Sequence, residues 1–141
     1  MIRTIVLGLA AASLAGAACA QEVSLSAHMM GSSEKPTAGD PNGMGHATVK
    51  VDTAKNQVCY TLMVEKLGSA ATMAHIHKAA ADAAGPVAVP LTAPDASGKS
   101  QACTNVDPAV AKDIAANPGG YYVNVHTNDF KAGAIRGQLS K

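Results

Sequence analysis

Three histidines in two separate segments have the side-chain type and the spacing of a metal site. His75 and His77 are one residue apart, and His126 ends a later segment over residues 121–126. Residues i and i+2 of a β-strand point to the same side, so the first two imidazoles share a face if their segment is extended. Should the two segments lie side by side, the three rings meet. Three neutral imidazole nitrogens suit copper or zinc, with one position open for water or a further donor.

Two further residues are candidate donors to the same ion. Met73 lies two residues before His75 and shares its face, and a thioether is a soft ligand that favours Cu(I). His46 begins an alternating segment over residues 46–52, on its polar face, and is a candidate fourth ligand. His28 also has methionines beside it, and we interpret it as a solvated residue or a transient metal contact.

Asn124 and Arg136 have two interpretations. They can act on an anion or a bound oxygen species, or they can tether strands through hydrogen bonds. In the second case the histidines join the same polar network, each ring satisfied by a neighbour or a backbone group, and no metal is needed. A metal site, a structural network and a site for an organic ligand therefore all remain open.

The composition and motifs argue against several other classes of function. The chain has 11 basic and 10 acidic residues, and this balance provides no electrostatic footprint for nucleic acid or an anionic membrane. Neither a Gly-x-Ser-x-Gly nucleophile motif nor a phosphate-binding glycine loop is present in the sequence. We assign no catalytic residue.

The first twenty residues are typical of a secretory signal peptide. Arg3 supplies a positive charge, an apolar run covers residues 5–18, and Ala18-Cys19-Ala20 has the small-x-small pattern of a cleavage site. The run is too short to span a membrane, and the rest of the sequence predicts no membrane span. We expect residues 1–20 to be removed and residues 21–141 to form one domain in the periplasm or outside the cell.

Removal of that leader leaves two cysteines, Cys59 and Cys103. An even pair in an oxidising compartment predicts a disulfide bond. The alternative is that both remain free thiols and serve as soft metal ligands.

Short alternating segments separated by turns predict an all-β fold. The expected strands cover residues 21–29, 46–52, 57–67, 73–77, 87–91, 121–127 and 134–139. Pro90 places the fifth of these at an edge, and residues 92–101 are expected to form a loop. Asp107-Pro108 is a typical helix start, with Pro at the first helical position, and the helix ends at about Ala116. An antiparallel sandwich or barrel with one short helix follows.

Three motifs resemble the CHRD family, a domain named for chordin that also occurs in many bacterial secreted proteins. They are His75-Ile76-His77, Gly85-Pro86-Val87 and the closing run over residues 121–139. The resemblance covers nearly all of residues 21–141. It implies an immunoglobulin-like Greek-key β-barrel similar to that of copper/zinc superoxide dismutases. The order of the three histidines and Arg136 resembles part of a dismutase copper site, without candidates for the bridging histidine or the zinc ligands.

We therefore expect an exported, non-catalytic binding domain that holds copper, or alternatively zinc. His75, His77 and His126 are the expected ligands, with help from His46 or Met73. One alternative is a protein-interaction module whose loops over residues 31–45 and 79–85 meet an unidentified partner, with the histidines stabilising the fold. Another is an oxidoreductase of dismutase type.

Overall fold

The computed structural model describes residues 22–141, in which eight strands form one sheet of antiparallel pairs. The predicted leader lies outside the described residues. The strands are β1 (Glu22–Met30), β2 (Met44–Asp52), β3 (Gln57–Glu65), β4 (Ala71–Lys78), β5 (Val87–Leu91), β6 (Lys99–Asn105), β7 (Tyr121–Thr127) and β8 (Ile135–Gln138). The helices are α1 (Pro108–Ala116) and the short 3-10 turns η1 (Gly31–Ser33) and η2 (Pro118–Gly120).

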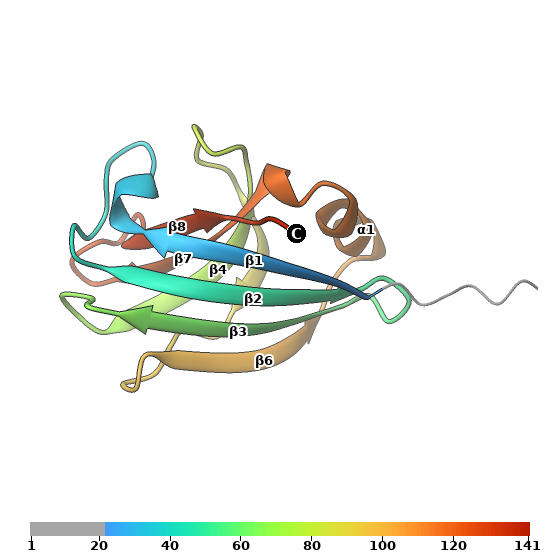
Figure 1. Ribbon diagram of the computed structural model, residues 1–141, viewed down its shortest axis with the longest axis horizontal. Coiled ribbons are helices and arrows are strands. Elements are labelled where there is room, and N and C mark those ends of the chain that lie inside the picture. Colours follow the sequence, from blue (N-terminus) through green and yellow to red (C-terminus); the bar gives the residue numbers. More distant parts are fainter. Residues whose placement is uncertain (1–21) are drawn as a thin grey trace, which may run out of the picture.

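The strand order β5-β4-β7-β8-β1-β2-β3-β6 curls into a nearly closed barrel. Figure 1 shows β1, β2, β3 and β6 in front of β4 and β7. β5 is an edge strand, as its proline predicts, and β6 is the other edge. The all-β barrel with one helix expected from the sequence is confirmed.

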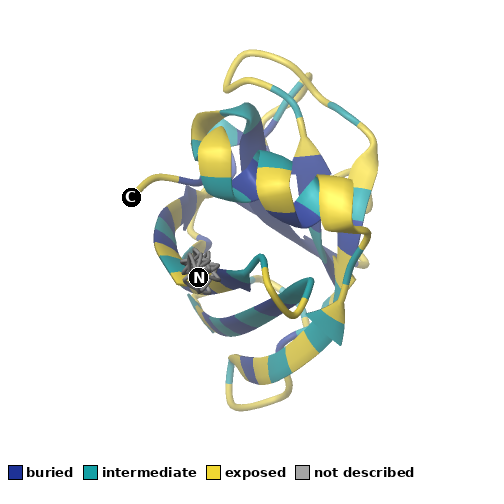
Figure 2. Ribbon diagram, turned by 90° about the vertical axis from the view of Figure 1, so that its right-hand side faces the viewer, coloured by how far each residue is buried: buried dark blue, intermediate teal, exposed yellow. Residues whose placement is uncertain are grey.

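Alternate residues of each strand fill the barrel with aliphatic side chains. Val49 of β2, Leu62 of β3, Ile76 of β4 and Val125 of β7 are all 0% exposed. Helix α1 lies across one end of the barrel, and its Ile114 joins this core (Figure 2). The period-two burial expected for half-buried strands therefore sets which side chains face outward.

Helix α1 begins as the sequence predicts. The Asp107 side chain accepts a hydrogen bond from the Ala109 backbone N–H at 2.7 Å, and Pro108 follows at the first helical position. The expected strands agree with the structure to within two residues at each end.

The prediction of a loop over residues 92–101 is wrong at its C-terminal end, where β6 begins at Lys99. Its inward positions include Ser100 and Ala102, so the segment lacks the large apolar side chains that mark a strand. Pairing with β3 makes it a strand, and this is a tertiary effect that local sequence does not report.

Cys59 and Cys103 form the predicted disulfide bond. They lie directly opposite each other on β3 and β6, with a sulfur–sulfur distance of 2.04 Å. The bond therefore ties the edge strand to the sheet, and the free-thiol alternative is excluded.

Candidate metal site

The three histidines come from neighbouring strands, and strand register places them on one face. β4 and β7 pair antiparallel, with Met73 opposite His126 and His75 opposite Asn124. The intervening residues face the barrel interior, so these side chains point outward. The candidate ligand nitrogens of His75, His77 and His126 lie within 4.8 Å of one another. The face sharing and the convergence expected from the sequence are confirmed.

Two of the rings are held by backbone carbonyls. His77 Nδ1 lies 2.8 Å from the Gly85 oxygen, and His126 Nδ1 lies 2.9 Å from the Lys131 oxygen. A carbonyl oxygen only accepts, so each Nδ1 carries the proton and each Nε2 presents a lone pair. Metal-binding histidines are usually oriented in this way, by a hydrogen bond from the ring nitrogen that does not bind.

The lone pairs of these two rings are used differently. His77 Nε2 is buried and has no hydrogen-bond partner among residues 22–141. His126 Nε2 lies 3.0 Å from His75 Nδ1, which donates to it because His126 is protonated on its other nitrogen. One buried acceptor in the cluster is therefore left unsatisfied, and such a group costs free energy unless something binds it.

Burial favours the neutral form of two rings of the cluster, His75 and His126. His77 is 9% exposed and His126 is 6% exposed, whereas His75 is half-buried. Desolvation lowers the pKa of His75, and the neighbouring His126 and His77 lower it further. Desolvation also lowers the pKa of His126, against a raising contribution from its hydrogen bond to the Lys131 carbonyl. Neutral imidazole is the form that binds a metal ion.

The loop over residues 79–86 covers the outer face beside the histidines, and Arg136 of β8 anchors it. The guanidinium donates to the Ala80 and Ala83 carbonyls, each at 2.8 Å, and the residue is only 1% exposed. Gln138 donates to the Ala79 carbonyl at 2.7 Å. Arg136 therefore positions the segment that carries Gly85, and the structure supports its tethering role.

Tyr122 lies between Arg136 and His77 of the cluster and contacts both. Its ring stacks on His77 with a centroid separation of 4.8 Å and an interplanar angle of 1°. The Arg136 guanidinium lies 3.5 Å from the centre of the same tyrosine ring, a cation–π contact. Because β7 lies between β4 and β8, the tyrosine ring fills the space between the histidine and the arginine.

Glu34 is a buried acid close to Arg136 and Asn124. Glu34, just after η1, is 3% exposed, and burial raises its pKa from 4.5 to about 7 against the opposing effects of the Arg136 charge and an Asn124 hydrogen bond. Only glycine fits at position 133, because a Cβ there would lie 2.4 Å from the Glu34 Cδ and the backbone φ is +149°. Asn124 is 1% exposed, lies opposite His75 in the strand register and hydrogen-bonds this acid.

The loop that carries Glu34 is fastened independently. Its Asp40 carboxylate accepts hydrogen bonds from the backbone N–H groups of Asn42, Gly43 and Gly68, and these lower the Asp40 pKa. The Asp40 backbone N–H donates to the Ala134 oxygen at 2.8 Å. These hydrogen bonds fix the path of the loop that carries the acid.

The remaining predicted donors are divided between two places. Met73 is 48% exposed and lies across from His126, at the rim of the cluster. His46 is not brought to the cluster. It lies on β2, separated from β7 by β8 and β1, and its ring neighbours His28 at a centroid distance of 4.9 Å. His46 was misplaced because one polar strand face does not indicate which part of a curved sheet it occupies.

Sequence reasoning did not identify Glu34 or Tyr122 as part of the site. The acid comes from a glycine- and serine-rich loop with no motif, so no feature of the sequence marks it. The tyrosine could have been found from its position two residues before Asn124 on the same strand face.

Comparison with known families finds the CHRD domain over residues 25–139. The chain belongs to the CHRD family. The match includes both strands that carry the histidine cluster, and it confirms the family expected from the sequence. No curated protein and no solved structure matches this CHRD domain. Among residues 22–141 we find no helix with the length and apolar character that a membrane crossing requires.

Proposed function

We propose that this CHRD domain is an exported, non-catalytic binding protein that holds one copper ion between His75, His77 and His126. The observation that carries the proposal is the buried, unpartnered Nε2 of His77 within a cluster whose candidate nitrogens all lie within 4.8 Å, as judged over residues 22–141.

One pair of nitrogens in the cluster is already spaced for an ion, while the separations of up to 4.8 Å would have to shorten. Nitrogens at about 2.0–2.1 Å from a tetrahedral metal lie about 3.3 Å apart. The separation of 3.0 Å between His75 Nδ1 and His126 Nε2 is already close to that value. An ion held by these two nitrogens would take the place of the hydrogen bond between the rings, and His75 would then carry its proton on Nε2.

Copper is favoured over zinc by the side chain at the rim. Met73 is the residue directly opposite His126 and is exposed, so its thioether can reach the open position. Thioether sulfur is a ligand for copper, whereas structural zinc sites are built from thiolate, imidazole and carboxylate. Zinc remains the alternative ion.

Export is supported by the Cys59–Cys103 bond and by the sequence of residues 1–20. Structural disulfides persist outside the reducing cytoplasm. N-terminal sequencing of protein recovered from the periplasm and the medium should give Gln21 as the first residue.

The experiment is metal analysis of protein purified without an affinity tag, followed by titration with Cu(II), Cu(I) and Zn(II). The wild type should bind one Cu(II) at this site, and His77→Ala and His75→Ala should each weaken that binding about tenfold or more. His46→Ala is the matched control for the Cu(II) titration only, because it removes an imidazole from the same barrel outside the cluster. Unchanged Cu(II) affinity in both cluster variants would contradict the proposal.

A structural role for the same residues makes a different prediction. The hydrogen bond between His75 and His126 favours it, because each ring then has a partner without an ion. In that case the cluster variants lose thermal stability while the wild type melts at the same temperature with and without Cu(II). A dismutase activity is disfavoured, because the guanidinium of Arg136 is committed to two loop carbonyls.

A further inference from the structure

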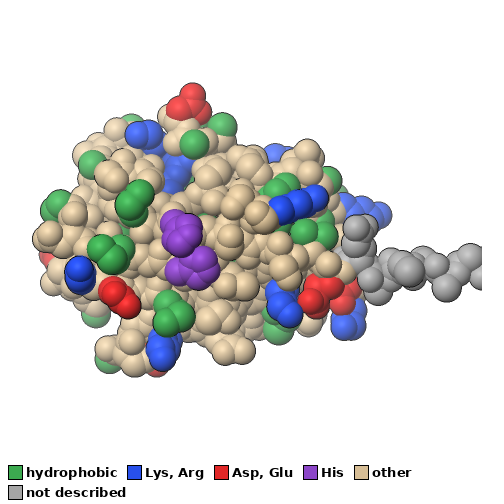
Figure 3. Space-filling model, in the orientation of Figure 1, with side chains coloured by type: hydrophobic (Ala, Val, Ile, Leu, Met, Phe, Trp, Pro, Cys, Tyr) green, Lys and Arg blue, Asp and Glu red, His purple; other side chains and the backbone are tan. Residues whose placement is uncertain are grey.

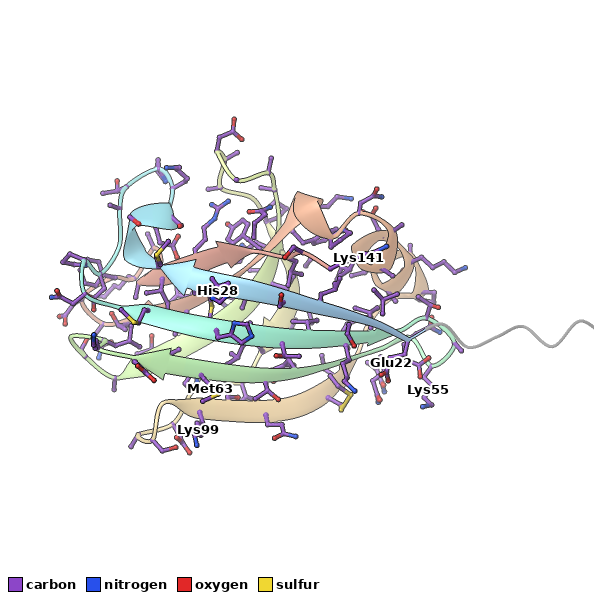
Figure 4. The ribbon with its side chains drawn as sticks, viewed as in Figure 1. Glu22, His28, Lys55, Met63, Lys99 and Lys141 are labelled. Atoms are coloured by element: carbon purple, nitrogen blue, oxygen red, sulfur yellow. A yellow bond between two sulfur atoms is a disulfide. The ribbon has the colours of Figure 1, made fainter. Side chains whose placement is uncertain are left out.

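A second group of histidine and sulfur side chains lies on the outer face of β1, β2 and β3, away from the three-histidine cluster. Strand register arranges it in two rows. His28, His46 and Met63 are directly opposite one another in the first row, and Met30, Met44 and Glu65 are opposite one another in the second. Figure 3 shows the histidine patch on this face with hydrophobic side chains around it, and Figure 4 labels His28 and Met63 there.

The methionines of this face are placed unlike core methionines. Of the five among residues 22–141, Met29 alone is fully buried, while Met30, Met44 and Met63 are 51%, 41% and 45% exposed. A methionine usually fills gaps in a core, and an exposed strand face favours β-branched or polar residues. Three thioethers around two imidazoles therefore have no packing explanation in this fold.

The two imidazoles are paired and incompletely satisfied. The ring centroids of His28 and His46 are 4.9 Å apart, with the ring planes tilted by 56°. Nδ1 of His46 is buried and, within the part of the chain that the structure describes, lacks a hydrogen-bond partner. The same side chains line an open groove of about 550 Å³.

We propose that this groove is a binding site for a soft monovalent ion, Cu(I) or its analogue Ag(I). Imidazole nitrogen and thioether sulfur together are the donors that such ions prefer. His28 and His46 supply the nitrogens, and Met63, which is opposite His46 on β3, supplies the nearest sulfur by register. Met30 and Met44 form the second row, and their flexible side chains can swing towards the ion.

This site is independent of the proposed function. In the sheet order, β8 separates the strand that carries His28 from the strand that carries His126. The donors also differ, because the first cluster offers three imidazoles and the groove offers two imidazoles with several thioethers. Loss of either site should therefore leave the other intact.

The test is titration with Ag(I) in chloride-free buffer, followed by NMR of the methionine ε-methyl groups and the histidine rings. The methyl resonances of Met30, Met44 and Met63 and the rings of His28 and His46 should shift together. Met29 is fully buried at the base of the groove, so its methyl group reports whether the core packing beneath the site changes. Cu(I), held anaerobically against a competing chelator, should give the same site.

Two variants separate metal binding from apolar contact. Met30→Leu/Met44→Leu/Met63→Leu keeps an apolar surface of similar size without sulfur, and it should weaken Ag(I) binding about tenfold or more. His77→Ala should leave Ag(I) binding at the groove unchanged. All substituted methionines are exposed, so a thermal melt should show a folded protein. Wild-type Ag(I) affinity in the leucine variant, or Ag(I) shifts confined to the three-histidine cluster, would overturn the proposal.

Discussion

Glu34 offers a test of the buried polar group that it forms with Arg136 and Asn124, and this test does not involve a metal. Its carboxyl is buried, and desolvation raises its pKa from 4.5 to about 7. The folded protein therefore keeps this proton up to about pH 7, whereas the unfolded chain loses it near pH 4.5. The stability contributed by the protonated acid is fully present below pH 4.5 and is lost as the pH rises through 7.

The magnitude follows from the displacement of the pKa. A change from 4.5 to about 7 corresponds to about 3 kcal/mol of unfolding free energy, as an upper value. Glu34→Gln replaces the acid with a neutral group of the same shape, so this variant lacks the titration. At pH 4 the variant and the wild type should have similar stability, and at about pH 8 the variant should be more stable by up to about 3 kcal/mol.

The assay is urea unfolding of metal-free protein by circular dichroism at several pH values. His75 and His126 act in the opposite direction, because their lowered pKa values mean that stability falls as the pH drops below 6.5. Subtracting the variant curve from the wild-type curve removes that contribution. A difference that stays constant between pH 5 and 8 would refute the reasoning.

Three shorter predictions concern the anchor, the disulfide and the pH dependence of binding. Arg136→Met should leave two loop carbonyls without donors and lower the unfolding free energy by about 2–3 kcal/mol, measured by urea unfolding. Limited proteolysis should then cut within residues 79–86, and an uncut loop would contradict the anchoring role. Replacing Cys59 and Cys103 by Ala should cost about 3–4 kcal/mol by the loop-entropy argument, and an unshifted urea midpoint would contradict it. Because burial lowers the pKa of His126, calorimetry should show constant Cu(II) affinity from pH 8 down to about 6.5, with weakening only at lower pH.

Local patterns predicted most of the fold because most strands here have one buried face. Alternation in residues 57–67 gave the inward Val58 and Leu62, and it put Cys59 on the outer side where β6 reaches it. The prediction missed β6 because that strand packs small and polar residues. The position of β6 depends on its pairing with β3 and on the disulfide, and neither produces a periodic pattern in the local sequence.

The candidate site was predicted to the extent that it depends on two paired strands. The period of two put His75 and His77 on one face, and pairing of β4 with β7 then delivered His126. Contacts that depend on loops were not predictable. The carbonyls of Gly85 and Lys131 that orient the rings, and the acid above Arg136, come from segments whose path only the folded chain defines.

The pairing of His28 with His46 also depends on strand register, which local sequence patterns do not predict. Met30 lies two residues after His28 and Met44 two residues before His46, so the period of two places each methionine on the face of its histidine. Only the register between β1, β2 and β3 shows that both rings share their face with methionines from other strands.

The most direct test of the central claim is electron paramagnetic resonance of the protein loaded with one equivalent of Cu(II). Nitrogen couplings count the imidazoles bound to the ion. We predict three coordinated imidazoles in the wild type and two in His77→Ala, with the wild-type spectrum retained in His28→Ala/His46→Ala. A spectrum that is identical in the wild type and in His77→Ala would contradict the account.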